Sequence, residues 1–401
     1  MKRILLIFRG DLADVVALHW LRTRQKMTVY TYTPLVGGAE VLPETAGDQA
    51  MRLGAESAYF GELREKLYRF MLVHAIRAGL RARNGSYLVG ALTRPLIAKE
   101  MTGIAEDNGC RLVGFVADPF SLDQLRYNSL FAAIAPGLQV LSVQAQWPFR
   151  TLTDLQRYAC RNNLPQPASL RGEFQVEQTV WGGRVRCGRS EDLWKELPEG
   201  LLPPPSGARS ARTQKQRMID IEFEHGLPVG LNGTRMDGLT LLAELHRLGH
   251  EQGIGRMDVI EEELLGIKTR IYQEAPAAQL INAAHKALED ITLSNEIVDI
   301  QEVLARHLCR MIYQGNWFTD LREAICDFFT RVQGNATGVI RMRLSRGQGM
   351  VVRRKAPAPV YKQDLLTQAR LGNFPVGDIA QFLNVWKYSK DAEQEVSTKK
   401  L

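Results

Sequence analysis

The chain of 401 residues is longer than one hydrophobic core usually supports, which predicts two or three domains. Hydrophobic residues make up 45% of it and charged residues 24%, values that indicate a globular protein and exclude a disordered, collagen-like or disulfide-rich chain. The net charge of +7 is small for this length and does not by itself indicate a nucleic-acid-binding protein.

No apolar run approaches the roughly 18–20 residues of a membrane-spanning helix, so we expect no membrane partner. The apolar residues 4–8 are followed at once by Arg9 and Asp11, and this run is too short for a signal peptide. The five cysteines are too widely spaced for a disulfide framework or a metal clip, and no ligand motif accompanies His246 and His250. We therefore expect a cytoplasmic protein without a metal site.

The first part of the chain alternates between strand-like and helix-like patterns. Mostly apolar runs, typical of strands buried on both faces of a parallel sheet, occur at residues 3–8, 27–33, 111–116 and 138–143. Helical periodicity lies between them at residues 13–24, 62–80, 95–108 and 123–134. This alternation predicts an α/β domain over residues 1–165, with a doubly wound parallel sheet.

The pattern changes after residue 165. Residues 176–189 are rich in Gly, Arg and Val without a helical period, and the basic, proline-containing residues 201–217 indicate an exposed loop. Strands are predicted at residues 218–224, 337–344 and 349–354, and helices at 238–248, 275–293, 296–313 and 320–333. We expect an α+β domain over residues 166–366, followed by an amphipathic helix and a frayed tail within residues 367–401.

Short strings in a fixed order along the chain carry a family resemblance. They include SYLVG at residues 86–90, TRPLIAK at 93–99, DQLR at 123–126, GIGRMD at 253–258, YQGNW at 313–317 and YKQDL at 361–365. In this order and spacing the strings closely resemble argininosuccinate synthases, from residue 1 to about residue 386. The resemblance does not establish function by itself, so each site residue is compared with the family pattern.

The resemblance implies a fold and an activity. It implies a nucleotide-binding domain of the ATP-pyrophosphatase (adenine nucleotide hydrolase-like) type, a synthetase and multimerisation domain, and a C-terminal helix that helps to build a homotetramer. The implied activity is that of an ATP-dependent carbon–nitrogen ligase in arginine biosynthesis, with ATP and Mg²⁺ as cofactors. Such an enzyme joins citrulline to aspartate and forms AMP and pyrophosphate.

The resemblance places a phosphate-binding loop, S-G-G-L-D-T-S in the family, at residues 9–15. Glycine N–H groups and hydroxyls would hold the phosphates there, but this chain keeps Gly10 alone and has Arg9, Asp11 and Asp14 at donor positions. A carboxylate 4 Å from a phosphate costs on the order of 4 kcal/mol at an effective dielectric constant near 20, and Arg9 offsets only part of this. Alternatively, Asp11 and Asp14 cap the following helix. Both interpretations predict impaired ATP binding in the family's manner.

The resemblance also assigns the amino-acid site. Tyr87, Arg126 and Glu261 match residues with which the family holds citrulline, whereas Arg184 stands at a serine position and Arg186 at a glutamate position. Arg126, Arg184 and Arg186 could form a cationic pocket for a carboxylate or phosphate ligand. A solvated basic strand and a purely structural role of Tyr87 and Arg126 are the alternatives.

The family's aspartate-binding loop corresponds to residues 116–123, where Asp123 alone is retained. Burying a ligand carboxylate against the remaining apolar and acidic residues costs several kcal/mol, so impaired aspartate binding is expected. Asp123 and Arg126 are the candidate catalytic residues. Near Glu261, the neighbouring Glu262 and Glu263 are expected to be solvated.

These observations lead to a divergent argininosuccinate-synthase-like protein, a candidate pseudoenzyme, that binds a small anionic or amino-acid-like molecule. A functional argininosuccinate synthase, or a ligase that uses another amine, is the alternative. Basic residues gather in the predicted hairpin at residues 337–354 and just after it, but no aromatic residues interleave with them, so an oligomer interface is favoured over nucleic acid.

Overall fold

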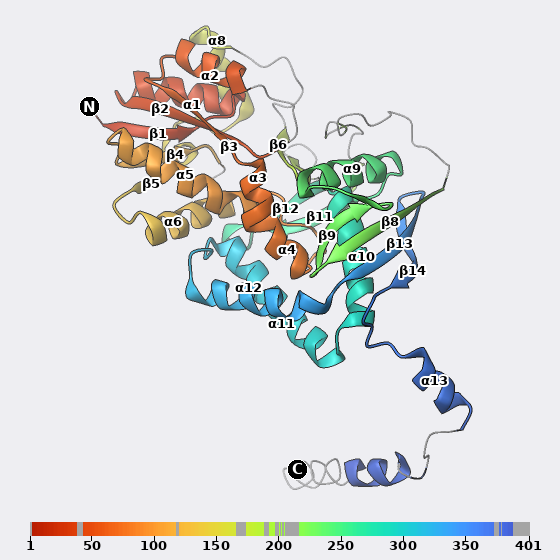
Figure 1. Ribbon diagram of the computed structural model, residues 1–401. Helices are drawn as coiled ribbons and strands as arrows, with labels where there is room; N and C mark the ends of the chain where they lie inside the picture. Colours follow the sequence, from red (N-terminus) through yellow and green to blue (C-terminus); the bar gives the residue numbers. More distant parts are fainter. Residues whose placement is uncertain are drawn as a thin grey trace. The chain divides into compact units, whose positions relative to one another are not determined.

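The computed structural model describes residues 2–37, 43–117, 120–165, 174–187, 192–196, 216–372 and 379–387, together with residues 200, 202, 204 and 377. The chain forms two compact units, Met1–Ala358 and Pro359–Leu401. The first unit contains the sheets described below (Figure 1). The domain boundaries expected after residues 165 and 366 remain predictions.

The N-terminal part is built on a parallel five-stranded sheet in the order β3-β2-β1-β4-β5. The strands are β1 (Arg3–Ile7), β2 (Thr28–Leu35), β3 (Ala58–Glu62), β4 (Leu112–Phe115) and β5 (Gln139–Ser142). After β3 the chain returns to the other side of β1, so the strand order reverses between β1 and β4. In open parallel sheets, ligands bind beyond the carboxyl ends of the strands at such a reversal.

Helices cover both faces of this sheet, as the doubly wound prediction requires (Figure 1). They are α1 (Leu12–Thr23), α2 (Pro43–Arg52), α5 (Arg94–Asp107), α6 (Leu122–Ile134), α7 (Val143–Gln146) and α8 (Leu152–Arg161). Side chains of β1 alternate between the layers: Ile4 and Leu6 pack with α1, α2 and α8, whereas Leu5 and Ile7 pack with α5 and α6. The predicted α/β class is therefore confirmed.

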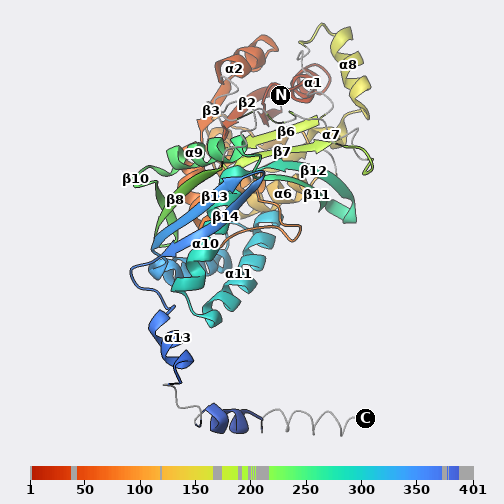
Figure 2. The same cartoon turned by 90° about the vertical axis from the view of Figure 1, so that its right-hand side faces the viewer.

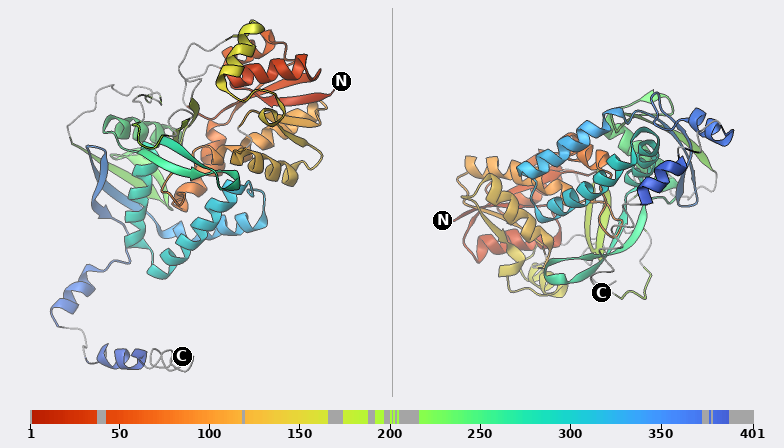
Figure 3. Two further views of the ribbon diagram at one scale, coloured as in Figure 1. Left: turned by 180° about the vertical axis from the view of Figure 1, so that it is seen from behind. Right: turned by 90° about the horizontal axis from the view of Figure 1, so that it is seen from below.

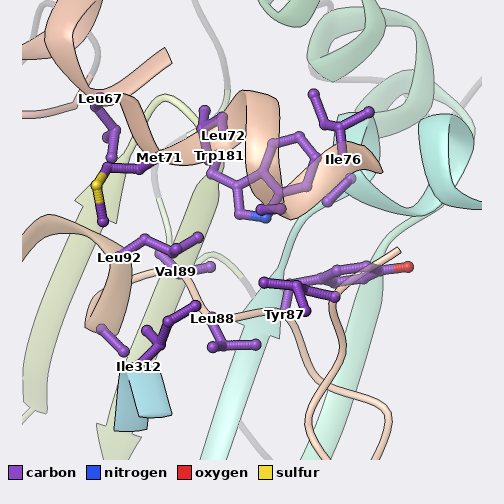
Figure 4. Packing of buried hydrophobic residues seen from close by; sticks show 14 of the residues in the cluster. Leu67, Met71, Leu72, Ile76, Tyr87, Leu88, Val89, Leu92, Trp181 and Ile312 are labelled. Carbon is purple, nitrogen blue, oxygen red and sulfur yellow. The ribbon is translucent and has the colours of Figure 1, made fainter. Parts of the chain in front are cut away.

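The predicted helix over residues 62–80 is present but not regular. It consists of α3 (Arg64–Leu67), a π-helical turn (Tyr68–Leu72) and α4 (Val73–Arg77). The buried Leu67, Met71, Leu72 and Ile76 face the core, where Figure 4 shows them near Trp181 and Val89. This helix therefore contributes to the core that the N-terminal part shares with the following sheets.

The rest of the first unit contains two antiparallel sheets. The four-stranded sheet has the order β11-β12-β7-β6, with β6 (Phe174–Thr179), β7 (Gly182–Cys187), β11 (Arg256–Glu262) and β12 (Lys268–Glu274). The five-stranded sheet has the order β10-β9-β8-β13-β14, with β8 (Arg217–Glu224), β9 (Leu227–Leu231), β10 (Thr234–Arg235), β13 (Gly338–Ser345) and β14 (Gln348–Lys355). Figure 2 shows β6 and β7 between the parallel sheet and the five-stranded sheet.

Long amphipathic helices complete this unit. They are α9 (Gly238–Glu251), α10 (Pro276–Thr292), α11 (Asn295–Gln314) and α12 (Asp320–Val332). Helix α11 packs against both α12 and α6, and Figure 3 shows α11 and α12 side by side. The helices predicted in this region are confirmed, as is the hairpin turn at Gly347, which has a positive φ of 81°. The loop predicted over residues 201–217 lies almost entirely outside the described residues.

The β6–β7 hairpin is joined to the parallel sheet by main-chain and side-chain contacts. The backbone N–H of Val180 donates to the carbonyl of Val36, just after β2 (2.8 Å). The rings of Trp181 and Tyr87 meet edge-on with centroids 6.4 Å apart (Figure 4). These contacts hold the hairpin at the carboxyl end of the sheet, where β1 and β4 also end.

The second unit contains α13 (Gln363–Arg370) and further helical residues at 379–387. Its large apolar side chains are exposed, among them Leu365, Leu371, Phe382 and Trp386. Among the described residues of the whole chain, no helix is long and apolar enough to cross a membrane.

Candidate substrate site

The loop between β1 and α1 is held by its own carboxylates. Asp11 is the N-cap of α1, and its Oδ1 accepts a hydrogen bond from the backbone N–H of Asp14 (2.8 Å). Oδ2 of Asp14 accepts the backbone N–H of Arg9 (2.6 Å) and lies 3.6 Å from Nε of the same residue. The capping interpretation is confirmed for Asp11, while Asp14 closes the loop around Gly10, whose φ is +85°.

The Asp14 carboxyl is fully buried, and its second oxygen, Oδ1, has no hydrogen-bond partner among the described residues. Burial, followed by the charge of Asp11, raises the pKa of Asp14 from 3.8 to about 7, although Arg9 acts in the opposite direction. The loop therefore holds an acidic group that changes its charge near neutral pH.

A second group of charges begins at the N-terminus of α6. Asp123 lies in the first turn of this helix, after the N-cap residue Ser121. One carboxylate oxygen of Asp123 faces Nη2 of Arg94 (2.7 Å) and the other faces Nη1 of Arg126 (2.8 Å). Burial alone would raise the pKa of Asp123, but the two guanidinium groups outweigh it and hold this pKa far below its usual range.

Strands β6 and β7 extend this group. Glu177 on β6 and Arg184 on β7 are direct cross-strand neighbours. Oε1 of Glu177 lies 2.5 Å from Nη1 of Arg94, and Oε2 lies 3.9 Å from Nε of Arg184. The Glu177 carboxylate also lies against the backbone of Gly90, where a Cβ atom would collide with it. The hairpin therefore places a carboxylate between arginines from two parts of the chain.

Glu261 on β11 is saturated by two neighbours. Its Oε2 lies 2.6 Å from Nη2 of Arg184, and its Oε1 accepts the hydroxyl of Tyr313 (2.8 Å). Arg126 lies over the Tyr313 ring, 5.1 Å from its centroid, and donates from Nε to the Tyr313 carbonyl (3.0 Å). Burial opposes ionisation of Glu261, yet Arg184 and Tyr313 hold its pKa below the usual value.

Arg186 pairs with Glu263, whose side chain is only 3% exposed. Oε2 of Glu263 also accepts the backbone N–H of Leu122 at the start of α6 (3.0 Å), where a negative charge is favoured by the helix dipole. The expectation that Glu263 is solvated is therefore wrong, because this carboxylate serves a helix N-terminus and an arginine at once. Glu262, its neighbour, is exposed as predicted.

Tyr87 is buried close to this group, in the core. Its backbone N–H donates to Oε1 of Gln273 and its carbonyl accepts from Nε2 of the same side chain, both at 2.8 Å. Burial raises the pKa of the Tyr87 hydroxyl to about 12. Within the described part of the chain, no hydrogen bond joins that hydroxyl to Arg126 or Glu261.

Two family models together match almost the whole chain. The N-terminal HUP domain of argininosuccinate synthase matches residues 3–165, and the C-terminal domain of the same enzyme matches residues 174–392. The chain belongs to the argininosuccinate synthase family. The resemblance inferred from the sequence motifs is thereby confirmed.

Relatives of full length support this assignment. The argininosuccinate synthase of Dictyoglomus thermophilum is 32% identical over 385 residues, which is 96% of either chain. That of Symbiobacterium thermophilum is 31% identical over the same shares of both chains. The argininosuccinate synthase of Pelodictyon phaeoclathratiforme is 29% identical over 399 residues, which is all of this chain and 99% of the relative. Argininosuccinate synthases are ATP-dependent ligases of arginine biosynthesis with small-molecule substrates.

In the loop after β1, the backbone donors of two residues are engaged within the loop. Phosphate binding at such a loop needs converging backbone N–H groups, but the N–H groups of Arg9 and Asp14 already donate to carboxylates of the same loop. The open side of Gly10 is also covered, since a Cβ atom there would lie 2.8 Å from Oε1 of Gln49. A phosphate would have to displace these groups and approach Asp11 and Asp14.

This group of charges also contains residues that were not among the candidate catalytic and substrate-binding residues, although Arg94 and Tyr313 lie within the family strings. Glu177, Glu263 and Tyr313 each bind a predicted site residue, and Arg94 joins Asp123 to Glu177. The signal for Glu177 is its place opposite Arg184 in a hairpin, which becomes readable once the turn at Val180 and Trp181 is recognised. The guanidinium groups of Arg126, Arg184 and Arg186 are each neutralised within the chain.

Proposed function

We propose that this chain retains the scaffold of argininosuccinate synthases without binding ATP or aspartate in the family's manner. The observation that carries the proposal is that charged side chains at the predicted ligand positions pair with one another. Arg184 pairs with Glu261, Arg186 with Glu263, and Asp123 with Arg94 and Arg126. Ligand binding would have to break buried pairs, and leaving one buried charge without its partner costs about 3–5 kcal/mol.

The phosphate loop supports the same proposal independently. Its donors are used internally, and Asp11 and Asp14 are of the same sign as a phosphate. At the aspartate position, the Leu122 N–H that begins α6 is already used by Glu263. An anionic substrate would therefore meet carboxylates in both places where it needs hydrogen-bond donors.

The test is pyrophosphate release with ATP–Mg²⁺, citrulline and aspartate, measured beside the Dictyoglomus thermophilum relative as a positive control. We expect no release above background and no heat of ATP binding in calorimetry. A double variant, Asp11→Gly with Asp14→Thr, brings the loop closer to the family pattern and should gain measurable ATP affinity. Release by the unmodified protein at a rate comparable to the relative would overturn the proposal.

An active argininosuccinate synthase, or a ligase that uses another amine, is the second candidate. It is favoured by Tyr87, Asp123, Arg126 and Glu261, which keep the residue types of the family at matching positions. For this candidate, substrates would have to exchange the internal ion pairs for pairs with themselves. AMP formation with any combination of amines and ureido or guanidino compounds would support it over the first.

We also propose a homo-oligomer, a tetramer by family resemblance. In the second unit, four large apolar side chains are 51–69% exposed: Leu365, Leu371, Phe382 and Trp386. Apolar surface of this kind usually marks an interface between proteins. Light scattering should give a mass several times that of one chain, and Phe382→Ser with Trp386→Ser should lower it.

A further inference from the structure

Arg184 occupies a position between two carboxylates and is itself 8% exposed. Its Nη2 lies 2.6 Å from Glu261, and its Nε lies 3.9 Å from Glu177. Those carboxylates come from β11 and β6, on either side of Arg184 in the four-stranded sheet. A flexible side chain is thus held by charges on both sides rather than extended into solvent.

We infer that Arg184 is a built-in occupant of the amino-acid site and the residue that excludes a ligand from it. The inference rests on the proposed function, in which Glu261 lies at a ligand position but pairs with Arg184 of the same chain. Without Arg184, Oε2 of Glu261 loses its ion-pair partner, while Oε1 keeps the Tyr313 hydroxyl. A shortened side chain would also leave the volume of the guanidinium and its methylene stem beside this carboxylate.

The chemistry of the ligand follows from the group that the substitution removes, the guanidinium of Arg184. A planar guanidinium offers a rigid fork of N–H donors that matches a carboxylate, whereas an ammonium is a compact point charge without that fork. With Arg184 replaced by a neutral residue, Glu177 and Glu261 would give the site an excess of negative charge. The opened site should therefore take a small molecule with a guanidinium group, and a neutral ureido group should bind there more weakly.

Arg186 provides a matched control on the same strand. It lies two residues from Arg184 on the same face of β7 and likewise pairs with a buried glutamate, Glu263. The Glu263 carboxylate, however, also holds the Leu122 N–H at the start of α6, and it is not a residue assigned to the amino-acid site. Loss of Arg186 removes a partly buried positive charge without opening the site beside Glu261.

The experiment compares the unmodified protein, Arg184→Ser and Arg186→Ser in thermal-shift and calorimetric titrations with L-arginine, L-citrulline and L-lysine at equal ionic strength. We expect L-arginine to bind Arg184→Ser at least tenfold more tightly than it binds the other two proteins. Arg184→Ser should bind L-arginine more tightly than it binds L-lysine or L-citrulline. Adding Glu261→Gln to Arg184→Ser should abolish the gain.

Equal arginine affinity in the unmodified protein and Arg184→Ser would overturn the inference, as would a gain that survives Glu261→Gln. If Arg184→Ser does not fold, the same titrations are made on Arg184→Gln, which keeps a hydrogen bond to Glu261 within reach. An arginine affinity of Arg184→Gln equal to that of the unmodified protein would then overturn the inference. ATP turnover by the unmodified protein would overturn the proposed function instead. Failure of the inference is thus seen in arginine binding by the variants, whereas failure of the proposed function is seen in ATP turnover by the unmodified protein.

Discussion

Two aspartates near the carboxyl end of the parallel sheet have opposite surroundings. Asp14, beyond β1, is fully buried, one of its oxygens has no hydrogen-bond partner among the residues that the structure describes, and its pKa rises to about 7. Asp123, beyond β4, faces a guanidinium on each oxygen, and its pKa lies far below the usual range. Burial acts in the same direction on both residues, so the neighbouring charges decide the difference: two guanidinium groups face Asp123, whereas Asp14 has one, on Arg9, and a second carboxylate, Asp11, beside it.

The two aspartates also differ in how they compare with the family pattern inferred from the sequence. Asp14 stands where the family resemblance expects a threonine, and a single partner, the half-exposed Arg9, offsets its burial. Asp123 stands where the family also has an aspartate, and Arg94 and Arg126 compensate it fully. We therefore expect Asp123 to matter for stability and Asp14 to matter for the response of the protein to pH.

The largest effect is expected from Asp123→Asn. This change leaves Arg94 and Arg126 without a shared negative partner in a largely buried position, which should lower the free energy of unfolding by about 3–5 kcal/mol. Urea unfolding at pH 7 measures it, with Asp14→Asn as the matched control on the other loop. A loss for Asp123→Asn no greater than that of the control would remove the distinction between the two aspartates.

The second prediction concerns pH. Because the pKa of Asp14 is raised in the folded state, the folded chain binds this proton more tightly than the unfolded chain, and stability falls as pH rises from about 4 to about 7. Between pH 5 and pH 8 the unmodified protein should lose about 2–3 kcal/mol more than Asp14→Asn. Urea unfolding of both proteins at the two pH values provides the measurement, and parallel pH profiles would contradict the raised pKa.

Much of the fold is readable from sequence because buried parallel strands leave long apolar runs. The strand β3, by contrast, is short, contains Gly61 and is only partly buried, so it lacks such a run. The irregular segment at residues 176–189 concealed the hairpin β6–β7, since glycines and arginines mask its alternation.

The site was predictable in its residues and not in its pairing. The motifs identify Arg126, Asp123 and Glu261. Which charged side chains pair with one another depends on strand register and on contacts between distant parts of the chain. The pair of Glu177 with Arg94, which lies 83 residues earlier, is an example. Glu263 was misjudged for the same reason. Its surroundings come from α6 and β7 and not from its acidic neighbours in sequence.

A third prediction sharpens the account of Asp14 by changing its neighbours one at a time. Arg9→Gln removes a charge that lowers the pKa of Asp14, and Asp11→Asn removes a charge that raises it. The two variants should therefore shift this pKa in opposite directions, by about 0.5–1 unit each, because one neighbouring charge is changed in each case. Carboxyl NMR titration of Asp14 measures both. Shifts of the same sign would contradict the opposite roles of the two neighbours, and no shift in either variant would show that burial alone sets this pKa.

The smallest effect on stability is expected at the helix N-caps, which the loops before α1 and α6 have in common. Ser121 accepts the Asp123 N–H at α6, and Asp11 accepts the Asp14 N–H at α1. Ser121→Ala should lower the free energy of unfolding by about 1 kcal/mol, and Asp11→Asn should lower it by less, because asparagine is an equally good cap. Urea unfolding at pH 7 compares them. A loss for Ser121→Ala as large as that for Asp123→Asn would mean that the cap, and not the paired carboxylate, holds the start of α6.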